Sequence, residues 1–294
     1  MARADTCPRA YARAAFLRAC ALDIEVRKPG NVSIASAGHG MTAAQFIASA
    51  DAAAAGLFSP DAHVGARILD AVRRTFDAVR CNTNLGIVLL CAPLCVALER
   101  IKSIGQTDLL DATQWHATTQ AVLDGLDIDD ACHAYRAIAF ANPGGLGDAP
   151  EQTVHAPPTV GLRAAMALAA ERDSIARQYA NGFTDVFDAA RAVNVTDPHE
   201  AMLEVFLTFL CAWPDSHILR KHGTATAQSV TRDASLYRER WRAAGHPSAS
   251  AELDAWDASL KAHGINPGTS ADLSVAALFV ALVLDGKRHE ARLL

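Results

Sequence analysis

Apolar residues recur every three or four positions in nearly every segment between glycine and proline breaks. This spacing is typical of amphipathic helices, and β-branched residues rarely alternate with polar ones, so no run predicts a strand. Alanine, leucine and arginine, all good helix formers, dominate these segments. The pattern predicts an all-α protein. The predicted helices span residues 9–27, 41–57, 62–80, 84–99, 107–121, 128–140, 159–180, 182–193, 198–212, 224–243, 249–263 and 270–285.

The chain is expected to form a single globular multi-helix domain over residues 1–294. Its 294 residues are 51% hydrophobic, which is enough for one sizeable core. Two stretches, 142–158 and 244–250, are linker candidates, but neither separates halves of distinct composition.

Charge and hydropathy argue against two classes of partner. The 27 basic and 32 acidic residues give a net charge of -5 with no basic block, so a nucleic-acid partner is not expected. The longest apolar run, 85–98, is about half of a membrane span and contains Pro93. The N-terminal stretch mixes arginine and aspartate early and has no apolar signal region. These features predict a cytoplasmic protein with no membrane contact.

The seven cysteines show neither a Cys-x-x-Cys pair nor a cysteine–histidine set at zinc spacing. This distribution argues against a disulfide framework and a structural metal site. Cys91 and Cys95 lie four residues apart, which makes them neighbours on one helix face. We expect two buried free thiols there.

Three polar residues interrupt apolar helix stripes: Asp173, Asp272 and Asn84. A buried carboxylate without a partner is costly, so each aspartate should meet an arginine or lysine, a metal ion, backbone donors or a ligand. An ion pair with one of the many arginines would be a purely structural outcome. The stripes are Leu162, Met166, Ala169 and Ala176 for the first, Val275, Ala276, Phe279 and Val283 for the second, and Val88, Cys91 and Cys95 for the third.

Five corners of glycine, proline and asparagine each meet a predicted helix start. Helix N-termini carry free backbone N–H groups and are natural sites for phosphate and other anions. Any one such corner is an ordinary cap, but five in a helical protein predict a central polar pocket that they surround together. The corners are KPGNVS (28–33), CNTNLG (81–86), NPGGLG (142–147), PDSHILRKHG (214–223) and NPGTSAD (266–272).

The order and wording of these corners resemble the triphosphoribosyl-dephospho-CoA synthase family, which prepares the prosthetic group of citrate lyase and malonate decarboxylase. Seven collinear blocks carry the resemblance over most of the chain, which makes it far more specific than any one motif. They are EVRKPGNVS (25–33), HGMTAAQFIASA (39–50), CNTNLGIVLLCAPL (81–94), ANPGGLG (141–147), AAERDSIARQY (169–179), PDSHILRKHG (214–223) and NPGTSADL (266–273).

The resemblance implies a glycosyltransferase that moves the triphosphoribosyl group of ATP to the ribose hydroxyl of 3′-dephospho-CoA and expels adenine. ATP is then a substrate, Mg²⁺ is implied by the triphosphate, and small-molecule nucleotides are the partners, with a homodimer as a possible assembly. Such a displacement needs a positioned and deprotonated hydroxyl, a cationic or metal-bearing cradle, and stabilisation of positive charge at the sugar.

The same resemblance implies the site residues. Carboxylates available as catalytic base are Glu25, Asp173, Asp215 and Asp272, of which Asp173 and Asp272 are also the candidate Mg²⁺ ligands. Candidate substrate-binding residues are Lys28, Gly30, Asn31, Ser33, His39, Asn82, Thr83, Asn84, Gly86, Arg177, His217, Arg220, Lys221 and Ser270.

Two corners depart from the wording of the members that serve citrate lyase. Those members typically read Asn-Thr-His-Lys-Gly where this chain has Asn84 and Leu85 in place of the histidine and lysine. They read Asp-Thr-Asn where this chain has Ser216 and His217 after the aspartate. The wording looks closer to the branch found in archaea and in bacteria with tetrahydromethanopterin-linked one-carbon metabolism. The acceptor could therefore differ.

Three alternatives remain open at this point. One is a diverged member that acts on another nucleotide or cofactor precursor in that one-carbon metabolism. The second is a metal-dependent phosphohydrolase, because carboxylates are present without an evident nucleophile. The third is a helical adaptor whose corners are only caps. Walker A, G-x-S-x-G and H-E-x-x-H runs are absent from the sequence, so those enzyme classes have no support.

Overall fold

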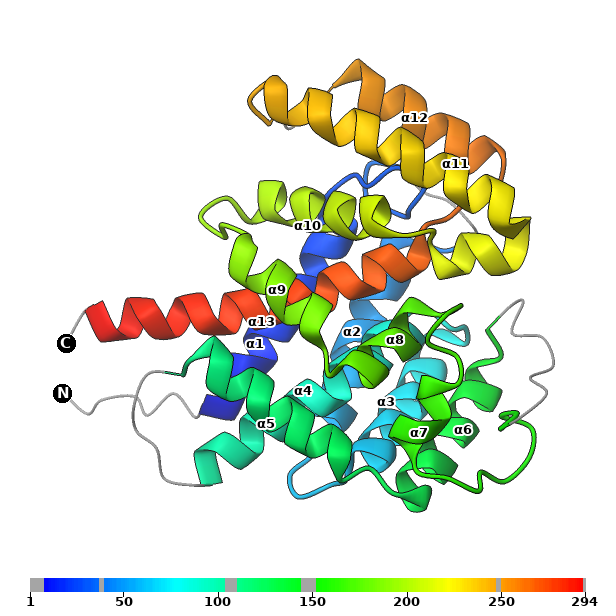
Figure 1. Cartoon of the computed structure of the whole chain (residues 1–294). Coiled ribbons are helices and arrows are strands. Elements are labelled where there is room, and N and C mark those ends of the chain that lie inside the picture. The colour runs from blue at the N-terminus through cyan, green and yellow to red at the C-terminus, as the bar shows by residue number, and fades with distance from the viewer. Residues whose placement is uncertain (1–7, 37–39, 104–109, 144–151, 247–249, 293–294) are drawn as a thin grey trace.

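The fold is described by a computed structural model that covers residues 8–36, 40–103, 110–143, 152–246 and 250–292. Within these ranges the regular elements are α-helices, as the sequence pattern predicts (Figure 1). They are α1 (Pro8–Glu25), α2 (Ala43–Leu57), α3 (Val64–Val79), α4 (Leu85–Ser103), α5 (Ala112–Asp124), α6 (Ile128–Ala141), α7 (Leu162–Ala167), α8 (Ser174–Asn181), α9 (Thr184–Ala192), α10 (Pro198–Ala212), α11 (Ser216–Ala243), α12 (Ala251–Ala262) and α13 (Gly268–Arg292).

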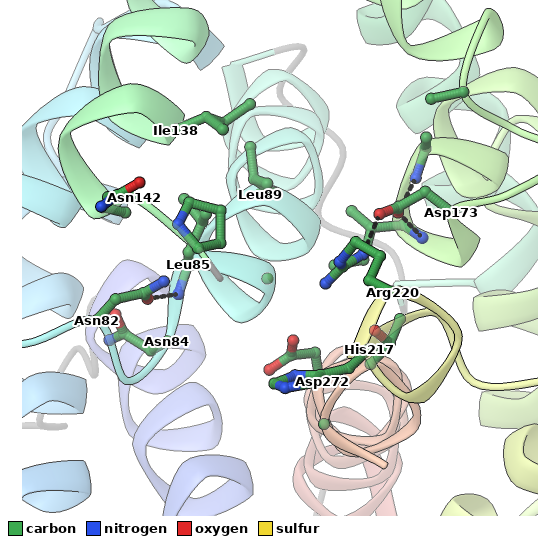
Figure 2. A pocket seen from close by; sticks show the side chains of 18 of the residues that line it. Asn82, Asn84, Leu85, Leu89, Ile138, Asn142, Asp173, His217, Arg220 and Asp272 are labelled. Atoms are coloured by element: carbon green, nitrogen blue, oxygen red, sulfur yellow. Dashed lines mark hydrogen bonds and ion pairs between the residues drawn. The ribbon is translucent and has the colours of Figure 1, made fainter. Parts of the chain in front are cut away.

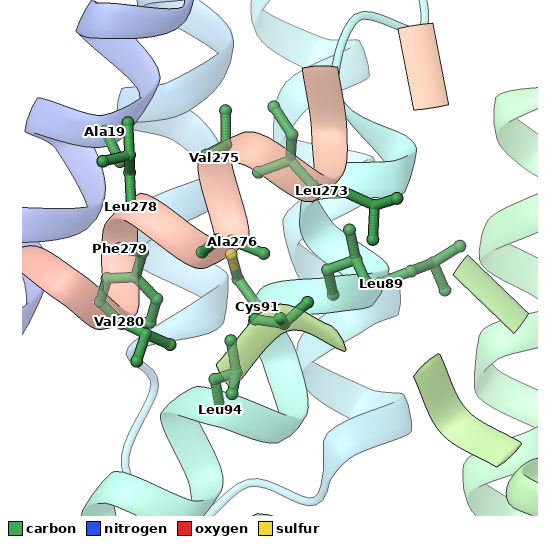
Figure 3. Close-up of a cluster of buried hydrophobic side chains, with 14 of the residues drawn as sticks. Ala19, Leu89, Cys91, Leu94, Leu273, Val275, Ala276, Leu278, Phe279 and Val280 are labelled. Atoms are coloured by element: carbon green, nitrogen blue, oxygen red, sulfur yellow. The ribbon is translucent and has the colours of Figure 1, made fainter. Parts of the chain in front are cut away.

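Helix α13 runs through the middle of the molecule and packs against α1, α4, α9 and α10 (Figure 1). Its apolar side chains lie between α1 and α4, as Figure 3 shows for Ala276 and Phe279. The Phe279 ring makes edge-to-face contacts with Phe16 and Trp115, at centroid distances of 6.1 Å and 5.7 Å. Such aromatic pairs add to the hydrophobic stabilisation and fix the position of α13.

In the part of the chain that the structure describes, α13 is the helix that is long and apolar enough, over residues 268–286, to cross a membrane by length and composition. Most of this stretch is buried inside the protein, which is the environment of a core helix. Cys91 and Cys95 of α4 are buried in the same core and form no disulfide, as the sequence predicts.

A second group of helices, α2, α3 and α6, packs beside this core. Gly65 at the start of α3 donates a backbone hydrogen bond to Asp130 Oδ1 at 2.7 Å. A Cβ at Gly65 would lie 2.6 Å from Asp130 Cα, so glycine is required for this approach of α3 and α6. The contact places the C-terminal end of α6 beside the pocket described below.

The prediction of one helix over residues 159–180 is wrong. The structure has α7 and α8 there, separated by a turn, and Asp173 is the N-cap of α8 with extended backbone dihedrals. Its carboxylate therefore caps a helix and does not interrupt a buried stripe. The periodicity was misleading because two short helices with a three- and four-residue apolar spacing can mimic one long helix.

Helix α11 starts at Ser216, earlier than predicted. It consists of two helical parts that meet at a kink, because the backbone of Gly223 (φ 81°, ψ 171°) is non-helical. The sequence pattern detected the part that follows Gly223. The part before it, residues 216–222, carries side chains that line the pocket. Helices α11 and α12 form an antiparallel pair at one end of the molecule (Figure 1).

Candidate active site

A pocket of about 750 Å³ opens where several helix ends meet. Each of the five corners contributes to its lining, for example with Asn31, Asn84, Asn142, His217 and Asp272. These segments are distant in sequence but adjacent in space, and four of them lie at the start or end of a helix. The lining also contains an apolar wall, so the pocket is polar on part of its surface.

Four helices begin beside this pocket: α4 at Leu85, α8 at Ser174, α11 at Ser216 and α13 at Gly268. The first turn of each helix has backbone N–H groups without an intrahelical acceptor, and the helix dipole gives that end a partial positive charge. Side chains already accept hydrogen bonds from the first N–H groups of α8 and α11. The N–H groups of Gly86, Gly268 and Thr269 at the starts of α4 and α13 have no acceptor among the described residues, and such groups fit the oxygens of an anion.

Side chains link three of these helix starts to one another. Asp215 Oδ1 accepts hydrogen bonds from the N–H groups of His217 and Ile218 in α11, at 2.8 Å and 3.1 Å. Its Oδ2 accepts from the N–H and hydroxyl of Ser270 in α13, at 2.7 Å and 2.8 Å. Ser216 Oγ accepts from the N–H of Ser174 in α8 at 2.8 Å. The relative positions of α8, α11 and α13 are therefore fixed.

Asp215 is only 1% exposed and does not line the pocket. Burial raises the pKa of its carboxyl group, and the hydrogen bonds from Ser270, Ile218 and His217 lower it in part. All four hydrogen bonds that Asp215 accepts come from backbone N–H groups or a hydroxyl of α11 and α13. The carboxylate therefore links these two helices.

Replacing Asp215 with asparagine is expected to lower the free energy of unfolding by about 2 to 4 kcal/mol, because the new NH₂ group faces donors and charge-assisted bonds are lost. Urea unfolding followed by circular dichroism measures this loss. Asp197 is exposed and caps the start of α10 in a similar way, so it is the matched control, and its asparagine variant should lose about 1 kcal/mol or less. Equal losses in both variants would contradict the linking role.

Asp173 and Arg220 form an ion pair at the rim of the pocket (Figure 2). Asp173 Oδ1 accepts from the N–H groups of Ile175 and Ala176 at 2.9 Å and 3.1 Å, and Oδ2 accepts from Arg220 Nη1 at 2.8 Å. The side chains of Asp173 and Arg220 are 28% and 24% exposed. Both oxygens of Asp173 are thus occupied, and the carboxylate holds the guanidinium of Arg220 at the pocket.

Asp272 lies in the first turns of α13, and its carboxylate points into the pocket (Figure 2). A Cβ at Gly86 would lie 2.6 Å from Asp272 Cγ and 2.8 Å from Ile175 Cδ1, so the carboxylate sits directly against the start of α4. No group of the described residues donates a hydrogen bond to it. Asp272 is therefore the pocket carboxylate with capacity for a ligand. The residues that share its helix face, Val275, Ala276, Phe279 and Val283, are buried as predicted.

Burial raises the pKa of Asp272 well above its usual value, and the negative charges of Asp23 and Asp215 raise it further. The positive charge of Arg220 lowers the pKa of Asp272, and the negative charge of Asp173 raises it. The carboxyl group of Asp272 is therefore poised to take up a proton at a pH above the usual range for aspartate.

Asp23 of α1 is a pocket residue that the sequence interpretation missed. Its Oδ1 lies 3.1 Å from Lys28 Nζ, and the same ammonium donates to the backbone oxygen of Asp23. Burial raises the pKa of Asp23, while Lys28 lowers it. Lys28 itself is 0% exposed and does not line the pocket. The structure thus places it as the buried partner of a carboxylate, in contrast to the predicted substrate-facing cation.

A family model described as CitG, ATP:dephospho-CoA triphosphoribosyl transferase, matches residues 9–291 of the chain. The chain belongs to this family. It is therefore a triphosphoribosyl transferase, and the resemblance inferred from the seven sequence blocks is confirmed. None of the curated proteins is significantly similar in sequence.

A crystal structure from Archaeoglobus fulgidus, of a protein provisionally named triphosphoribosyl-dephospho-CoA synthase, is similar to this family member. The TM-score is 0.63 and the sequence identity is 22%, with 81% of this chain and 98% of the other covered. At this identity the likeness shows a shared fold.

Ten of the predicted site residues of this transferase line the pocket. Seven others do not. Glu25 pairs with Arg18 at 2.7 Å, Arg177 stacks on Trp213, and Gly30 donates to Asp257. Lys28, Ser33, Asp215 and Ser270 are buried beside the pocket, and His39 lies outside the described residues. The ten lining residues are Asn31, Asn82, Thr83, Asn84, Gly86, Asp173, His217, Arg220, Lys221 and Asp272.

A sequence signal for the missed Asp23 was present. It follows Phe16, Ala19 and Cys20 on one helix face, and these three residues are buried, so it interrupts an apolar stripe as Asp272 does. No comparable signal marks the apolar lining, because such residues look like ordinary core. Among the described residues, no group of three or more acidic, histidine or cysteine side chains is placed to hold a metal ion.

Proposed function

We propose that this family member transfers the triphosphoribosyl group of ATP to a ribose hydroxyl of 3′-dephospho-CoA and releases adenine. The observation that carries the proposal is the pocket in which Arg220, Lys221 and the start of α13 lie beside Asp272, a carboxylate to which none of the described residues donates a hydrogen bond. Such a site offers binding for a polyanion and a proton acceptor within one cavity.

The triphosphate would bind at the charged side of the pocket. The start of α13 supplies the backbone N–H groups of Gly268 and Thr269, and Arg220 supplies a guanidinium whose position is fixed by Asp173. Lys221 is exposed at the same side and adds a second positive charge. Because the links through Asp215 and Ser216 hold these donors in place, little reorganisation is needed when the substrate binds.

Asp272 would act as the general base. In the reaction the acceptor oxygen forms a bond to C1′ of the ribose, the bond from C1′ to adenine N9 breaks, and its electron pair leaves with adenine. The hydroxyl proton passes to the carboxylate, and the departing adenine takes up a proton, so charge is balanced over the cycle. A base works best when its pKa lies near the working pH, and the raised pKa of Asp272 shifts this group in that direction.

Asp272 and Asp23 bring two negative charges to the pocket. When positive charge develops on the ribose as the adenine bond breaks, a nearby carboxylate lowers the energy of that state. Lys28 holds the Asp23 carboxylate in place from the buried side. Asp23 would therefore help to stabilise the positive charge that develops on the ribose.

Mg²⁺ would be held mainly by the phosphate oxygens of the substrate, because a carboxylate bound to Mg²⁺ could not act as the base and Asp272 is assigned that role. Asp173 is not available either, since both of its oxygens already accept hydrogen bonds. When bound, the ion would neutralise charge on the triphosphate.

The test is to incubate the protein with ATP, Mg²⁺ and dephospho-CoA and to analyse the products by mass spectrometry. The expected products are free adenine and dephospho-CoA enlarged by one triphosphoribosyl group. Adenine release only with a different acceptor nucleotide would correct the acceptor and retain the transfer. Formation of ADP in place of adenine would point to phosphoryl transfer or hydrolysis and contradict the proposal.

A further inference from the structure

The lining of the pocket is divided by chemistry. Figure 2 shows Asp173, Arg220, His217 and Asp272 on one side. The amide side chains of Asn82 and Asn84 come from the opposite side, and apolar residues of α4 and α6 lie at one end, as Leu89 and Ile138 show. A ligand with a highly charged part and an uncharged part would find a matching surface for each.

The apolar end is built by separate elements that are held together. Ile138 belongs to α6, Met166 to α7 and Leu89 to α4, and all three line the pocket. The hydroxyl of Tyr135 in α6 donates to the backbone oxygen of Gln152 at 2.9 Å. The Gln152 side chain in turn donates to the hydroxyl of Thr159 at 2.7 Å and accepts from the N–H of Thr159 at 3.1 Å. These bonds keep the segment before α7 against α6 and preserve the apolar surface.

The amides beside this end present one donor and one acceptor. Asn82 Oδ1 accepts from the N–H of Leu85 at 3.2 Å, so its NH₂ group is the part available to a ligand. Asn84 Nδ2 donates to the backbone oxygen of Ser49 at 3.2 Å, so its carbonyl oxygen is the part available. A neighbouring donor and acceptor match the edge of adenine, which presents ring-nitrogen acceptors and an amino donor.

The covalent structure of ATP decides which ligand part reaches this end. The ribose separates the triphosphate from the base, so a triphosphate held by Arg220, Lys221 and the start of α13 directs the base toward the opposite, uncharged lining. The flexible arm of dephospho-CoA carries no such constraint. Binding of a flat purine is also favoured because its faces are removed from water when they pack against aliphatic side chains such as Ile138 and Leu89.

We propose that the apolar end lined by Leu89, Ile138 and Met166 is the subsite for the adenine base of ATP, with Asn82 and Asn84 bonding the edge of the ring. This inference rests on the proposed function and deepens it, because it assigns the leaving group of the transfer to a named part of the pocket. Adenine is thereby distinguished from purines that carry a carbonyl group at C6.

The experiment is isothermal titration calorimetry with Mg²⁺ and four probes: ATP, ITP, inorganic tripolyphosphate and 4′-phosphopantetheine. In the Ile138→Trp variant the new ring fills the apolar end, so the affinity for ATP is expected to fall about tenfold or more, while that for tripolyphosphate changes less than about twofold. The matched control is Ile128→Trp, which introduces the same ring at an exposed position of α6 outside the pocket and should leave all affinities unchanged.

A second measurement needs no variant. The unmodified protein is expected to bind ITP about tenfold or more weakly than ATP, because the C6 carbonyl of ITP faces the Asn84 oxygen. Equal affinity for ATP and ITP would overturn the subsite, as would an Ile138→Trp variant that loses 4′-phosphopantetheine binding and keeps ATP binding. Either of these results together with normal adenine release leaves the proposed transfer standing, whereas failure of the unmodified protein to bind both ATP and tripolyphosphate contradicts the transfer itself.

Discussion

Replacing Asp272 with asparagine is expected to slow adenine release about a hundredfold or more, because the general base is lost. Asparagine keeps the shape of the side chain but cannot accept the proton of the acceptor hydroxyl. The measurement is the steady-state rate of adenine formation from ATP and dephospho-CoA. Asp70→Asn, at an exposed ion pair with Arg74 on α3, is the matched control and should retain full activity.

The same Asp272→Asn variant should be as stable as the unmodified protein or more stable, because a carboxylate near Asp23 and Asp215 is a source of repulsion. The pKa of Asp272 is raised in the folded protein, so the folded state holds its proton to a higher pH than the unfolded state. The stability of the unmodified protein therefore falls as pH rises from the usual aspartate pKa of 3.8 toward the raised value. The variant lacks this contribution, so its advantage in the free energy of unfolding should grow over that interval.

Urea unfolding of both proteins between pH about 4 and about 8 gives this difference. An Asp272→Asn protein that melts early and still releases adenine at the normal rate would remove Asp272 from the site and assign it a structural role.

Replacing Gly86 with alanine is expected to reduce activity about tenfold to a hundredfold, with little loss of stability. The added methyl group would overlap the Asp272 carboxylate and lie 2.8 Å from Ile175 Cδ1. Both neighbours are side-chain ends, so they can move aside, and the carboxylate then leaves its place against the start of α4. Alanine also favours the helix, which offsets part of the strain.

Gly125→Ala is the control for this variant, because its Cβ would make an ordinary contact at 3.6 Å with Val122 O and it lies outside the pocket. Adenine release and melting temperature measured on both variants separate the two effects. Full activity in Gly86→Ala would show that the position of Asp272 is not critical for the reaction.

Much of the site could be predicted from local signals in the sequence. The corners were visible because glycine, proline and asparagine at helix ends have a local conformational cause, and all five contribute to one pocket. The position of Asp272 followed from helical periodicity, since α13 is one uninterrupted core helix whose apolar face fixes the direction of each side chain. The kind of reaction came from the resemblance of the seven blocks, since spacing alone does not identify a substrate.

The rest depended on tertiary contacts that no local pattern contains. Lys28 stands in a corner, but whether its ammonium turns to a substrate or to Asp23 is decided by how the corner folds back on α1. Asp173 appeared to lie within a helix because the turn between α7 and α8 has no glycine or proline to mark it. The apolar end is assembled from α4, α6 and α7, which only packing brings together.

The pocket at the starts of α4, α8, α11 and α13 is proposed to bind the triphosphate of ATP. A crystal structure of the protein with Mg²⁺ and ATP, without an acceptor, would test this binding. We expect triphosphate oxygens within hydrogen-bond distance of the Arg220 guanidinium and of the backbone N–H groups of Gly268 or Thr269 at the start of α13. A triphosphate bound outside this pocket, or turned toward Ile138 with the base at Arg220, would contradict it.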